Sequence, residues 1–360
     1  RAVGEVMSIG KTYKEAFQKA IRSLEIGQFG LGFAKDFQEK SKEELLKMLV
    51  EPNSQRQFIM YEALRKGATV DELFALTKIK HYFIEQMKEL VEEEEALLAN
   101  KGQVPAPEAL KQAKLDGFSD KYLGQILEVP EEDIRNARIA QGVEEVWEGI
   151  HVSGTKDNAY YYSTYHCKDE SPVSDNKNKI MILGGGPNRI GQGIEFDYCC
   201  VHAAMALKKA GFETIIVNCN PETVSTDYDT SDKLYFEPLT LEDVLSIYKK
   251  EQPLGVIAQF GGQTPLNLSA DLEKYGVKIL GTSPEVIDMA EDRDLFRAMM
   301  DKLGIPMPEA GMAVDVDEAL AIAEKIGYPV MVRPSYVLGG RGMEVVYDPE
   351  NLRIYMEAAE

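Results

Sequence analysis

The fold is decided by residues 180–193, which read Ile180-Met181-Ile182-Leu183-Gly184-Gly185-Gly186-Pro187-Asn188-Arg189-Ile190-Gly191-Gln192-Gly193. The apolar start of this stretch predicts a short buried strand, and the glycine-rich remainder is typical of a turn between a strand and a helix. In such turns, backbone N–H groups approach phosphates and nucleotides closely. The stretch therefore predicts a strand of a parallel sheet with a ligand site at its carboxyl end.

A second stretch of the same kind reads Val330-Met331-Val332-Arg333-Pro334-Ser335 and precedes Gly339-Gly340-Arg341-Gly342. An arginine at the end of an apolar strand, beside a turn that exposes backbone amides, suits a nucleoside triphosphate. Because Arg333 continues an apolar run, we expect it to be buried, and a buried arginine needs a partner. That partner is an anionic ligand or an internal carboxylate.

Strands and helices alternate from Lys179 onward, which predicts a parallel sheet covered on both faces. The expected strands of this sheet are 179–183, 214–217, 255–259 and 277–280, and its expected helices are 195–210, 241–250, 265–275 and 284–303. From Gly304 a new α+β unit is expected to start, with a helix over 315–326 packed against a strand at 329–332 and a further strand at 343–347. Loops rich in Gly, Asn, Gln and Thr follow the strands, as at 218–221 and 260–264. They indicate the ligand edge of the sheet.

The first 142 residues are helical in pattern almost throughout, with Thr12 as the expected N-cap of the first helix. Further helices are expected at 79–100, 107–115 and 119–127, and from residue 130 onward. Nothing here concentrates catalytic residue types, so a packing or assembly module is favoured. Residues 143–178 form a connector, in which Tyr160–Tyr165 is expected to be a strand packed between two neighbours.

Composition excludes several classes of function. The formal net charge of -20 repels phosphate backbones, so a nucleic-acid partner is disfavoured. The four cysteines lack metal-ligand spacing, and Cys199, Cys200 and Cys219 are expected to be small buried hydrophobes. A reducing, cytoplasmic location follows. No apolar run reaches membrane-spanning length, so no membrane association is expected.

Two alternatives start from single features of the chain. The loop at 184–193 resembles a dinucleotide fingerprint, which favours a nicotinamide-dependent oxidoreductase. That fold places an acid at the end of its second strand, whereas this strand ends in Asn218-Cys219-Asn220-Pro221, with Glu222 as the nearest acid. The other alternative is a non-catalytic oligomerisation module built on the helices at 31–142.

Taken together, several stretches of the chain closely resemble the large subunit of carbamoyl-phosphate synthase. The matching residues are 4–7, 183–200, 217–230, 234–238, 259–267, 281–284, 290–293 and 333–341. The resemblance implies a multidomain chain from the central part of that subunit, with an all-α domain followed by an α/β parallel-sheet domain and the opening of an α+β ATP-grasp domain. The implied division is 1–30 for the tail of the carboxyphosphate synthetic domain, 31–174 for the helical oligomerisation domain with its connector, 175–303 for the pre-ATP-grasp domain and 304–360 for the start of the ATP-grasp domain.

The resemblance also implies the activity of the parent protein. It is an ATP-dependent, glutamine-hydrolysing ligase that makes carbamoyl phosphate from bicarbonate, glutamine-derived ammonia and two ATP, for arginine and pyrimidine synthesis. The implied cofactors are ATP, Mg²⁺ or Mn²⁺, and K⁺. The implied partners are a glutaminase small subunit, a second copy bound through the helical domain, and ATP and carbamate as ligands.

Site residues carry over by position within this resemblance. The implied ATP-binding residues are Arg333, Gly339, Gly340 and Arg293, and the loops facing the carbamate contain Gly185, Asn188, Arg189, Gly191, Gly261, Gly262, Gln263 and Thr264. The metal ligands of the family lie beyond residue 360, so the span alone is expected to be inactive, with no catalytic or metal-binding residue of its own.

Overall fold

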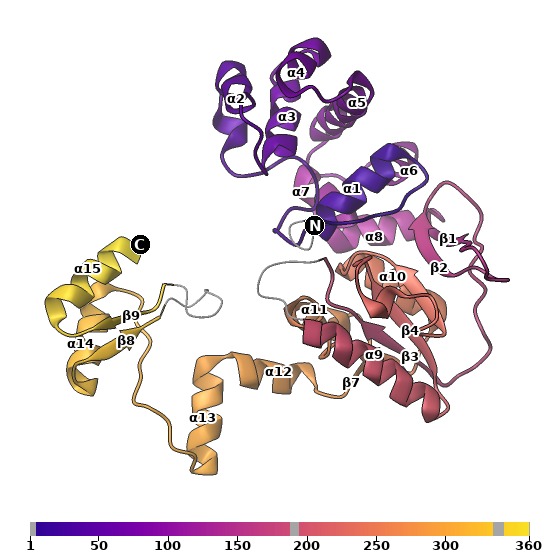
Figure 1. Ribbon diagram of the computed structural model, residues 1–360. Coiled ribbons are helices and arrows are strands. Elements are labelled where there is room, and N and C mark those ends of the chain that lie inside the picture. The colour runs from indigo at the N-terminus through magenta and orange to yellow at the C-terminus, as the bar shows by residue number, and fades with distance from the viewer. Residues whose placement is uncertain (1–4, 188–193, 334–341, 360) are drawn as a thin grey trace. The chain divides into compact units, whose positions relative to one another are not determined.

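The computed structural model describes residues 5–187, 194–333 and 342–359 of the 360-residue chain. The chain divides into two units, Arg1–Pro284 and Glu285–Glu360 (Figure 1). The first unit holds a helical part and a seven-stranded sheet, and the second holds a two-stranded sheet with its helices. The predicted fold class, a helical domain followed by an α/β domain and the opening of an α+β domain, is confirmed.

The helical part contains eight α-helices among the described residues. They are α1 (Tyr13–Ser23), α2 (Lys42–Met48), α3 (Arg56–Arg65), α4 (Val70–Thr77), α5 (His81–Leu98), α6 (Pro107–Leu115), α7 (Asp120–Leu127) and α8 (Glu131–Ala140), with a 3-10 turn at Phe37–Glu39. One apolar core joins them, and Leu45, Leu90 and Leu123 within it are fully buried. Thr12 caps α1 as predicted, since its hydroxyl accepts from the backbone N–H of Glu15 at 3.2 Å.

The sheet of the first unit has the strand order β1-β2-β5-β4-β3-β6-β7. Its strands are β1 (Val146–Ile150), β2 (Tyr160–Thr164), β3 (Lys179–Leu183), β4 (Glu213–Asn218), β5 (Lys233–Phe236), β6 (Gly255–Ile257) and β7 (Ile279–Leu280). All neighbours are parallel except β1 and β2. The predicted parallel sheet is therefore confirmed. The prediction that Tyr160–Tyr165 forms a strand between two neighbours is also confirmed, because β2 lies between β1 and β5.

The alternation of side chains along each strand decides which helices cover which face. Met181 and Val217 point to a core that α10 (Leu241–Glu251) and α11 (Gln263–Lys274) complete. Ile182 and Ile216 point the other way, to a core with α9 (Ile194–Lys209). The helices therefore lie on both faces, as in other parallel sheets. A 3-10 turn at Val224–Thr226 follows β4.

Two sequence expectations about this region were wrong. Cys199 is exposed, not buried, because α9 packs on the sheet through Cys200 and Ala204 and turns Cys199 outward. The single helix expected over 284–303 is two helices, α12 (Pro284–Glu291) and α13 (Arg293–Leu303). Asp292 separates them by capping α13, since its carboxylate accepts from the backbone N–H of Leu295 at 2.9 Å.

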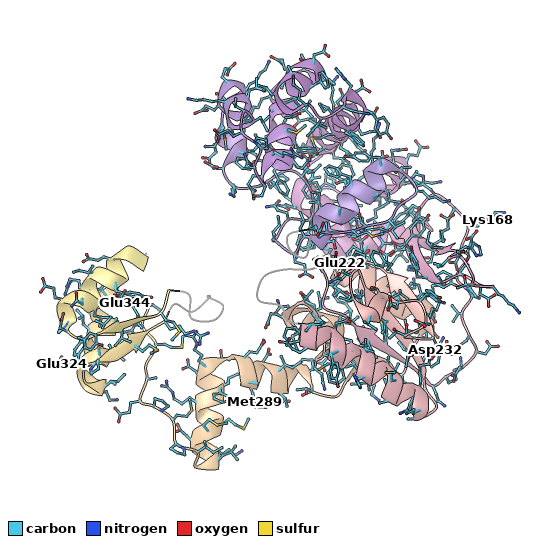
Figure 2. All side chains as sticks on the ribbon, in the orientation of Figure 1. Lys168, Glu222, Asp232, Met289, Glu324 and Glu344 are labelled. Atoms are coloured by element: carbon cyan, nitrogen blue, oxygen red, sulfur yellow. The ribbon has the colours of Figure 1, made fainter. Side chains whose placement is uncertain are left out.

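The second unit pairs β8 (Val330–Val332) with β9 (Glu344–Val346) in antiparallel fashion. Helices α14 (Val316–Ile326) and α15 (Pro349–Ala359) contribute Ala323 and Leu352 to its small core. Acidic side chains contribute to the strong negative charge on both units: Asp232 of the first unit and Glu324 and Glu344 of the second are exposed (Figure 2).

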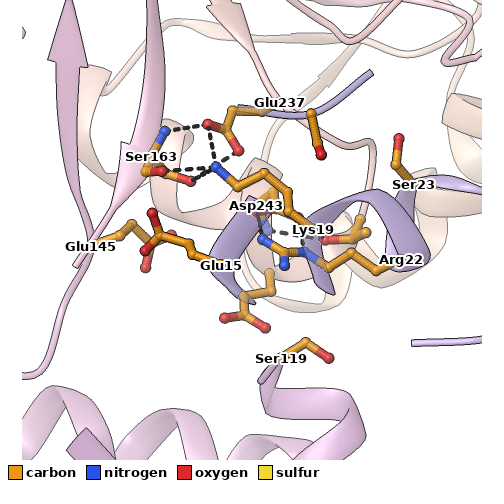
Figure 3. Close-up of polar contacts among 12 residues, drawn as sticks. Glu15, Lys19, Arg22, Ser23, Ser119, Glu145, Ser163, Glu237 and Asp243 are labelled. Atoms are coloured by element: carbon orange, nitrogen blue, oxygen red, sulfur yellow. Dashed lines mark hydrogen bonds and ion pairs between the residues drawn. The ribbon is translucent and has the colours of Figure 1, made fainter. Parts of the chain in front are cut away.

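A layer of buried charges joins the helical part to the sheet, and we call it the ionic layer. It consists of Lys19, Arg22, Lys114, Asp120, Arg138, Glu237, Glu242 and Asp243, all buried or nearly so. The ammonium of Lys19 donates to the Ser163 carbonyl at 2.7 Å and lies 3.4 Å from the Glu237 carboxylate (Figure 3). Arg22 forms a bidentate pair with Asp243 at 3.0 and 3.1 Å. The first unit thus closes around paired charges as well as apolar cores.

Candidate functional site

The carboxyl ends of β3, β4 and β6 meet at one edge of the sheet, where the sequence predicts a ligand site. Asn218, the last residue of β4, organises this edge. Its side-chain oxygen accepts from the backbone N–H of Gly186 at 3.0 Å and of Cys219 at 2.9 Å, while its amide donates to the Ser225 hydroxyl at 2.9 Å. With all these groups paired, Asn218 fixes the loop after β3 against the loop after β4.

The loop after β6 also approaches the loop after β3 closely. A Cβ on Gly261 would lie 2.4 Å from the carbonyl oxygen of Gly184, and a Cβ on Gly184 would lie 2.3 Å from the side chain of Asn218. A side chain at position 261 would clash with backbone atoms, which cannot turn aside. A side chain at position 184 would clash with Asn218, whose side chain is held by its hydrogen bonds. Gly262 follows as the N-cap residue of α11, whose first N–H groups face the same edge.

Glu25, which the sequence analysis missed, reaches this edge from the segment after α1. Its carboxylate accepts from the Thr264 hydroxyl at 2.7 Å and packs against Gly186. The neighbouring Ser23 hydroxyl lies 3.3 Å from the Cys219 sulfur. The helical part therefore contributes a carboxylate to the strand ends, and no local motif marks it because its partners are more than 150 positions away in the sequence.

The structure places the predicted site residues as follows. Gly185 lies in the loop after β3, and Gly261, Gly262, Gln263 and Thr264 lie between β6 and the first turn of α11, so these residues share one edge. Asn188, Arg189 and Gly191 lie outside the described residues, as do Gly339 and Gly340 of the second unit. Arg293 is the half-buried first residue of α13.

Arg333 is exposed, which contradicts the expectation that it is buried. The reason is the period of the strand. Val330 and Val332 pack toward the core of the second unit, so Met331, which is 63% exposed, and Arg333 share the opposite face. The apolar residues of α14 and α15 pack on the side of the strand that carries Val330 and Val332. The guanidinium is consequently accessible to an anion.

We call the loops at the carboxyl ends of β3, β4 and β6 the strand-end edge. Its side chains suit the binding of a ligand and not nucleophilic catalysis. Burial raises the pKa of the Cys219 thiol to about 12, so it is a packing residue and no nucleophile. Among residues 5–187, 194–333 and 342–359, no three His, Cys, Asp or Glu side chains are close enough to hold a metal ion. Besides the Glu25 carboxylate, this edge consists of backbone N–H groups, hydroxyls and amides.

Replacing Gly261 by alanine is expected to lower the free energy of unfolding of the first unit by about 3 kcal/mol, because β6 and β3 would have to separate. Denaturant unfolding followed by circular dichroism measures this. Gly276→Ala is the matched control: its φ is +83° with nothing within 4 Å of the added Cβ, so only backbone strain of about 1 kcal/mol is expected. Equal losses in the two variants would contradict the close approach.

Three family models together match nearly all of the chain. The oligomerisation domain of the carbamoyl-phosphate synthetase large chain matches residues 5–142, the preATP-grasp domain of carbamoyl phosphate synthase matches 176–289, and the ATP-binding domain of its L chain matches 292–360. Carbamoyl phosphate synthase large chains are similar over the whole span: that of Archaeoglobus fulgidus is 54% identical over 367 residues, and that of Myxococcus xanthus is 52% identical over 366. The chain belongs to the carbamoyl phosphate synthase large-chain family.

The match covers all of this chain and 34% of each of these two relatives, so the chain spans about a third of their length. A biotin carboxylase domain of Hydrogenobacter thermophilus 2-oxoglutarate carboxylase is also similar, with 23% identity and a TM-score of 0.40 over 51% of this chain and 40% of that one. None of the helices in the described part of the chain has the length and apolar character that a membrane span needs.

Proposed function

We propose that this chain works within a carbamoyl-phosphate synthase that joins bicarbonate, glutamine-derived ammonia and phosphate from two ATP into carbamoyl phosphate. The observation that supports it most is the similarity to large chains of that enzyme from the first to the last residue of the chain. We infer the same domain division as the sequence predicts, at residues 30, 174 and 303. A cytoplasmic location, a glutaminase partner and self-association through the helical part belong to this proposal.

In this proposal the second unit contributes to ATP binding. Arg333 fits a phosphate group because its guanidinium is a planar cation with several N–H donors and is exposed at a strand end. Arg293, Gly339 and Gly340 would assist it. No acidic cluster for Mg²⁺, Mn²⁺ or K⁺ is present among the described residues, so the metals that neutralise the phosphate charge need ligands from other parts of the protein.

The strand-end edge of the first unit is the proposed carbamate side. Its paired amides and hydroxyls hold the loops in one arrangement without an ionisable nucleophile. That character suits an unstable intermediate such as carbamate, which needs hydrogen-bond donors and exclusion of water more than acid–base chemistry. We infer that Gln263, which is exposed in the first turn of α11 and whose amide also donates to the Asn267 side chain at 2.8 Å, lies on this side of the site.

A chimera tests the proposal in a complete enzyme. The corresponding third of the Archaeoglobus fulgidus large chain is replaced by residues 1–360, and ATP-dependent carbamoyl phosphate formation is measured with ammonia as the nitrogen source. Activity within about tenfold of the parent is expected, equivalent to about 1.4 kcal/mol. A chimera that folds and assembles but makes no carbamoyl phosphate would contradict the proposed function.

In the same chimera, Arg333→Met is expected to lower kcat/KM for ATP by about a hundredfold, because a charged donor to the phosphates is lost. Arg353→Met is the control, since Arg353 is exposed on α15 of the same unit and outside the proposed site. Unchanged kinetics in the Arg333 variant would remove this residue from the ATP site while leaving the rest of the proposal standing.

A further inference from the structure

The helix α9 presents an apolar face to solvent. Cys200 and Ala204 on its inner side are fully buried in the core that it shares with β3 and β4. Tyr198 and Met205 on its outer side are 62% and 52% exposed. A helix that covers a sheet usually turns polar residues to water, whereas a helix that is apolar all round is usually covered on both sides. No described element of the first unit covers the outer side of α9.

The exposed residues of α9 form one stripe, which we call the outer face of α9. They recur every three or four positions, so they lie on the same side of the helix. The helix α11, on the opposite face of the same sheet, exposes mainly polar side chains, among them Asn267, Asp271 and Glu273. An apolar outer side is therefore particular to α9. The outer face consists of Glu195, Tyr198, Cys199, His202, Met205, Ala206 and Lys209.

The surroundings of the outer face are ordered before any partner binds. Tyr198 and His202 stack with their ring centroids 4.0 Å apart. Val224, another exposed apolar residue, lies beside α9, because its backbone N–H donates to the Asp197 carboxylate at 3.0 Å. Ser225 donates to the same carboxylate at 3.2 Å. Apolar side chains gathered on one surface in this way are typical of a protein–protein contact.

The outer face matches itself in size when two copies of α9 lie antiparallel. With a two-fold axis beside His202, Tyr198 faces Ala206 of the second copy, and Met205 faces Cys199 of the second copy. A large side chain thus meets a small one at each of these positions, as helix packing requires. The symmetry repeats both contacts, so one stripe supplies both sides of the interface.

Charge favours the same arrangement. Glu195 in the first turn and Lys209 in the last turn are exposed at opposite ends of the outer face. Antiparallel packing places Glu195 opposite Lys209 of the second copy, twice, whereas parallel packing would bring like charges together. We propose that the outer face of α9 docks on the same face of a second copy of this chain. Because one helix pair buries less than the 1,200 Å² or so of a standard interface, the dimer is weak, with a Kd of about 10–100 μM.

Sedimentation equilibrium of the complete chain, from about 5 to 500 μM, covers this range of Kd. Met205→Glu places a charge inside the contact and is expected to weaken dimerisation by about tenfold or more. Asn267→Glu on the exposed side of α11 is the matched control and leaves dimerisation unchanged. Both positions are exposed in the single chain, so both variants are expected to fold, which circular dichroism checks.

Charge reversal tests the orientation of the two helices. Glu195→Lys alone and Lys209→Glu alone are each expected to weaken dimerisation about threefold or more, because each brings like charges together at both ends. The double variant re-forms both pairs with their signs exchanged and is expected to dimerise as the parent chain does. A double variant that is no better than either single variant would overturn the antiparallel contact.

A chain that is monomeric at about 500 μM would overturn the proposal, as would dimerisation that Met205→Glu leaves unchanged. The second result would leave standing the proposed self-association through the helical part, because that contact does not involve α9. Alkylation of Cys199 identifies a different occupant. If Cys199 resists alkylation in the chimeric large chain while the complete chain is monomeric, another segment of the longer protein covers α9, and the second copy is overturned as its occupant.

Discussion

Replacing Glu242 by glutamine is expected to lower the free energy of unfolding of the first unit by about 3–5 kcal/mol, the usual cost of breaking a buried ion pair. Glu242 is 6% exposed and its two oxygens have separate tasks. One lies 2.6 Å from the Lys114 ammonium, and the other accepts from the backbone N–H of Asp120 at 2.7 Å. A neutral amide leaves Lys114 and Arg138 buried with less compensating charge.

The pH dependence of this stabilisation has a definite sign. Burial opposes ionisation of Glu242, but Lys114, Arg138 and Arg22 outweigh burial and lower the pKa of the carboxyl from 4.5 to about 2. The folded state therefore holds this proton less tightly than the unfolded state. The contribution of Glu242 to stability is complete above pH 4.5 and is lost as the pH falls toward 2.

Denaturant titrations at pH 7 and at pH 3 measure both effects. Glu85→Gln on α5 is the matched control, since this glutamate is exposed and the same atoms change. We expect the control to stay within about 0.5 kcal/mol of the parent chain. A Glu242 variant as stable as the control at pH 7 would show that the ionic layer does not hold the helical part on the sheet.

The parallel sheet could be predicted from the sequence because apolar periodicity and turn residues are local signals. Strands such as β3 and β4 are short apolar runs between polar loops, and helices such as α10 begin at recognisable caps. For the same reason, the glycine-rich loops predicted which segments lie at the carboxyl ends of the strands, whereas a ligand at that edge stays a prediction. Each of these inferences needs only a few neighbouring residues.

What the sequence could not predict depends on partners that are distant along the chain. Lys19 and Arg22 belong to an amphipathic helix, on which charged residues are expected to face water. Both are turned inward, because Lys19 pairs with Glu237 directly after β5 and Arg22 pairs with Asp243 of α10. Glu25 at the strand ends is a case of the same kind. For Arg333, the pattern predicted the strand correctly but not which of its two faces would be covered.

Replacement of the buried Lys19 is expected to cause the second large loss of stability. Lys19→Met is expected to cost about 3–5 kcal/mol at pH 8, because Glu237 would be buried without its cation and would have to stay an uncompensated anion or take up a proton. Lys19 is 2% exposed and Glu237 is 1% exposed. The Glu237 carboxylate keeps the hydroxyl of Ser163 at 2.9 Å, which satisfies hydrogen bonds but does not neutralise charge.

This cost should shrink in acid. Burial, with the nearby Asp243 carboxylate, raises the pKa of Glu237 from 4.5 to about 7, even though Lys19 acts in the opposite direction. The folded state thus holds this proton more tightly than the unfolded state, so this group's contribution to stability falls as the pH rises from 4.5 to 7. Without Lys19 the pKa of Glu237 rises further, and the decline extends to higher pH.

The free energies of unfolding of Lys19→Met and of the parent chain are therefore compared at pH 5.5 and pH 8. The comparison tests whether Glu237 ionises between these two pH values. The difference between the two proteins is expected to be smallest at pH 5.5, where the carboxyl is protonated in both proteins, and to grow through pH 7. Lys111→Met on the exposed face of α6 controls for the loss of a surface charge. A defect of equal size at both pH values would mean that Glu237 does not change its charge in this range, and that Lys19 stabilises the layer through its hydrogen bonds to backbone carbonyls alone.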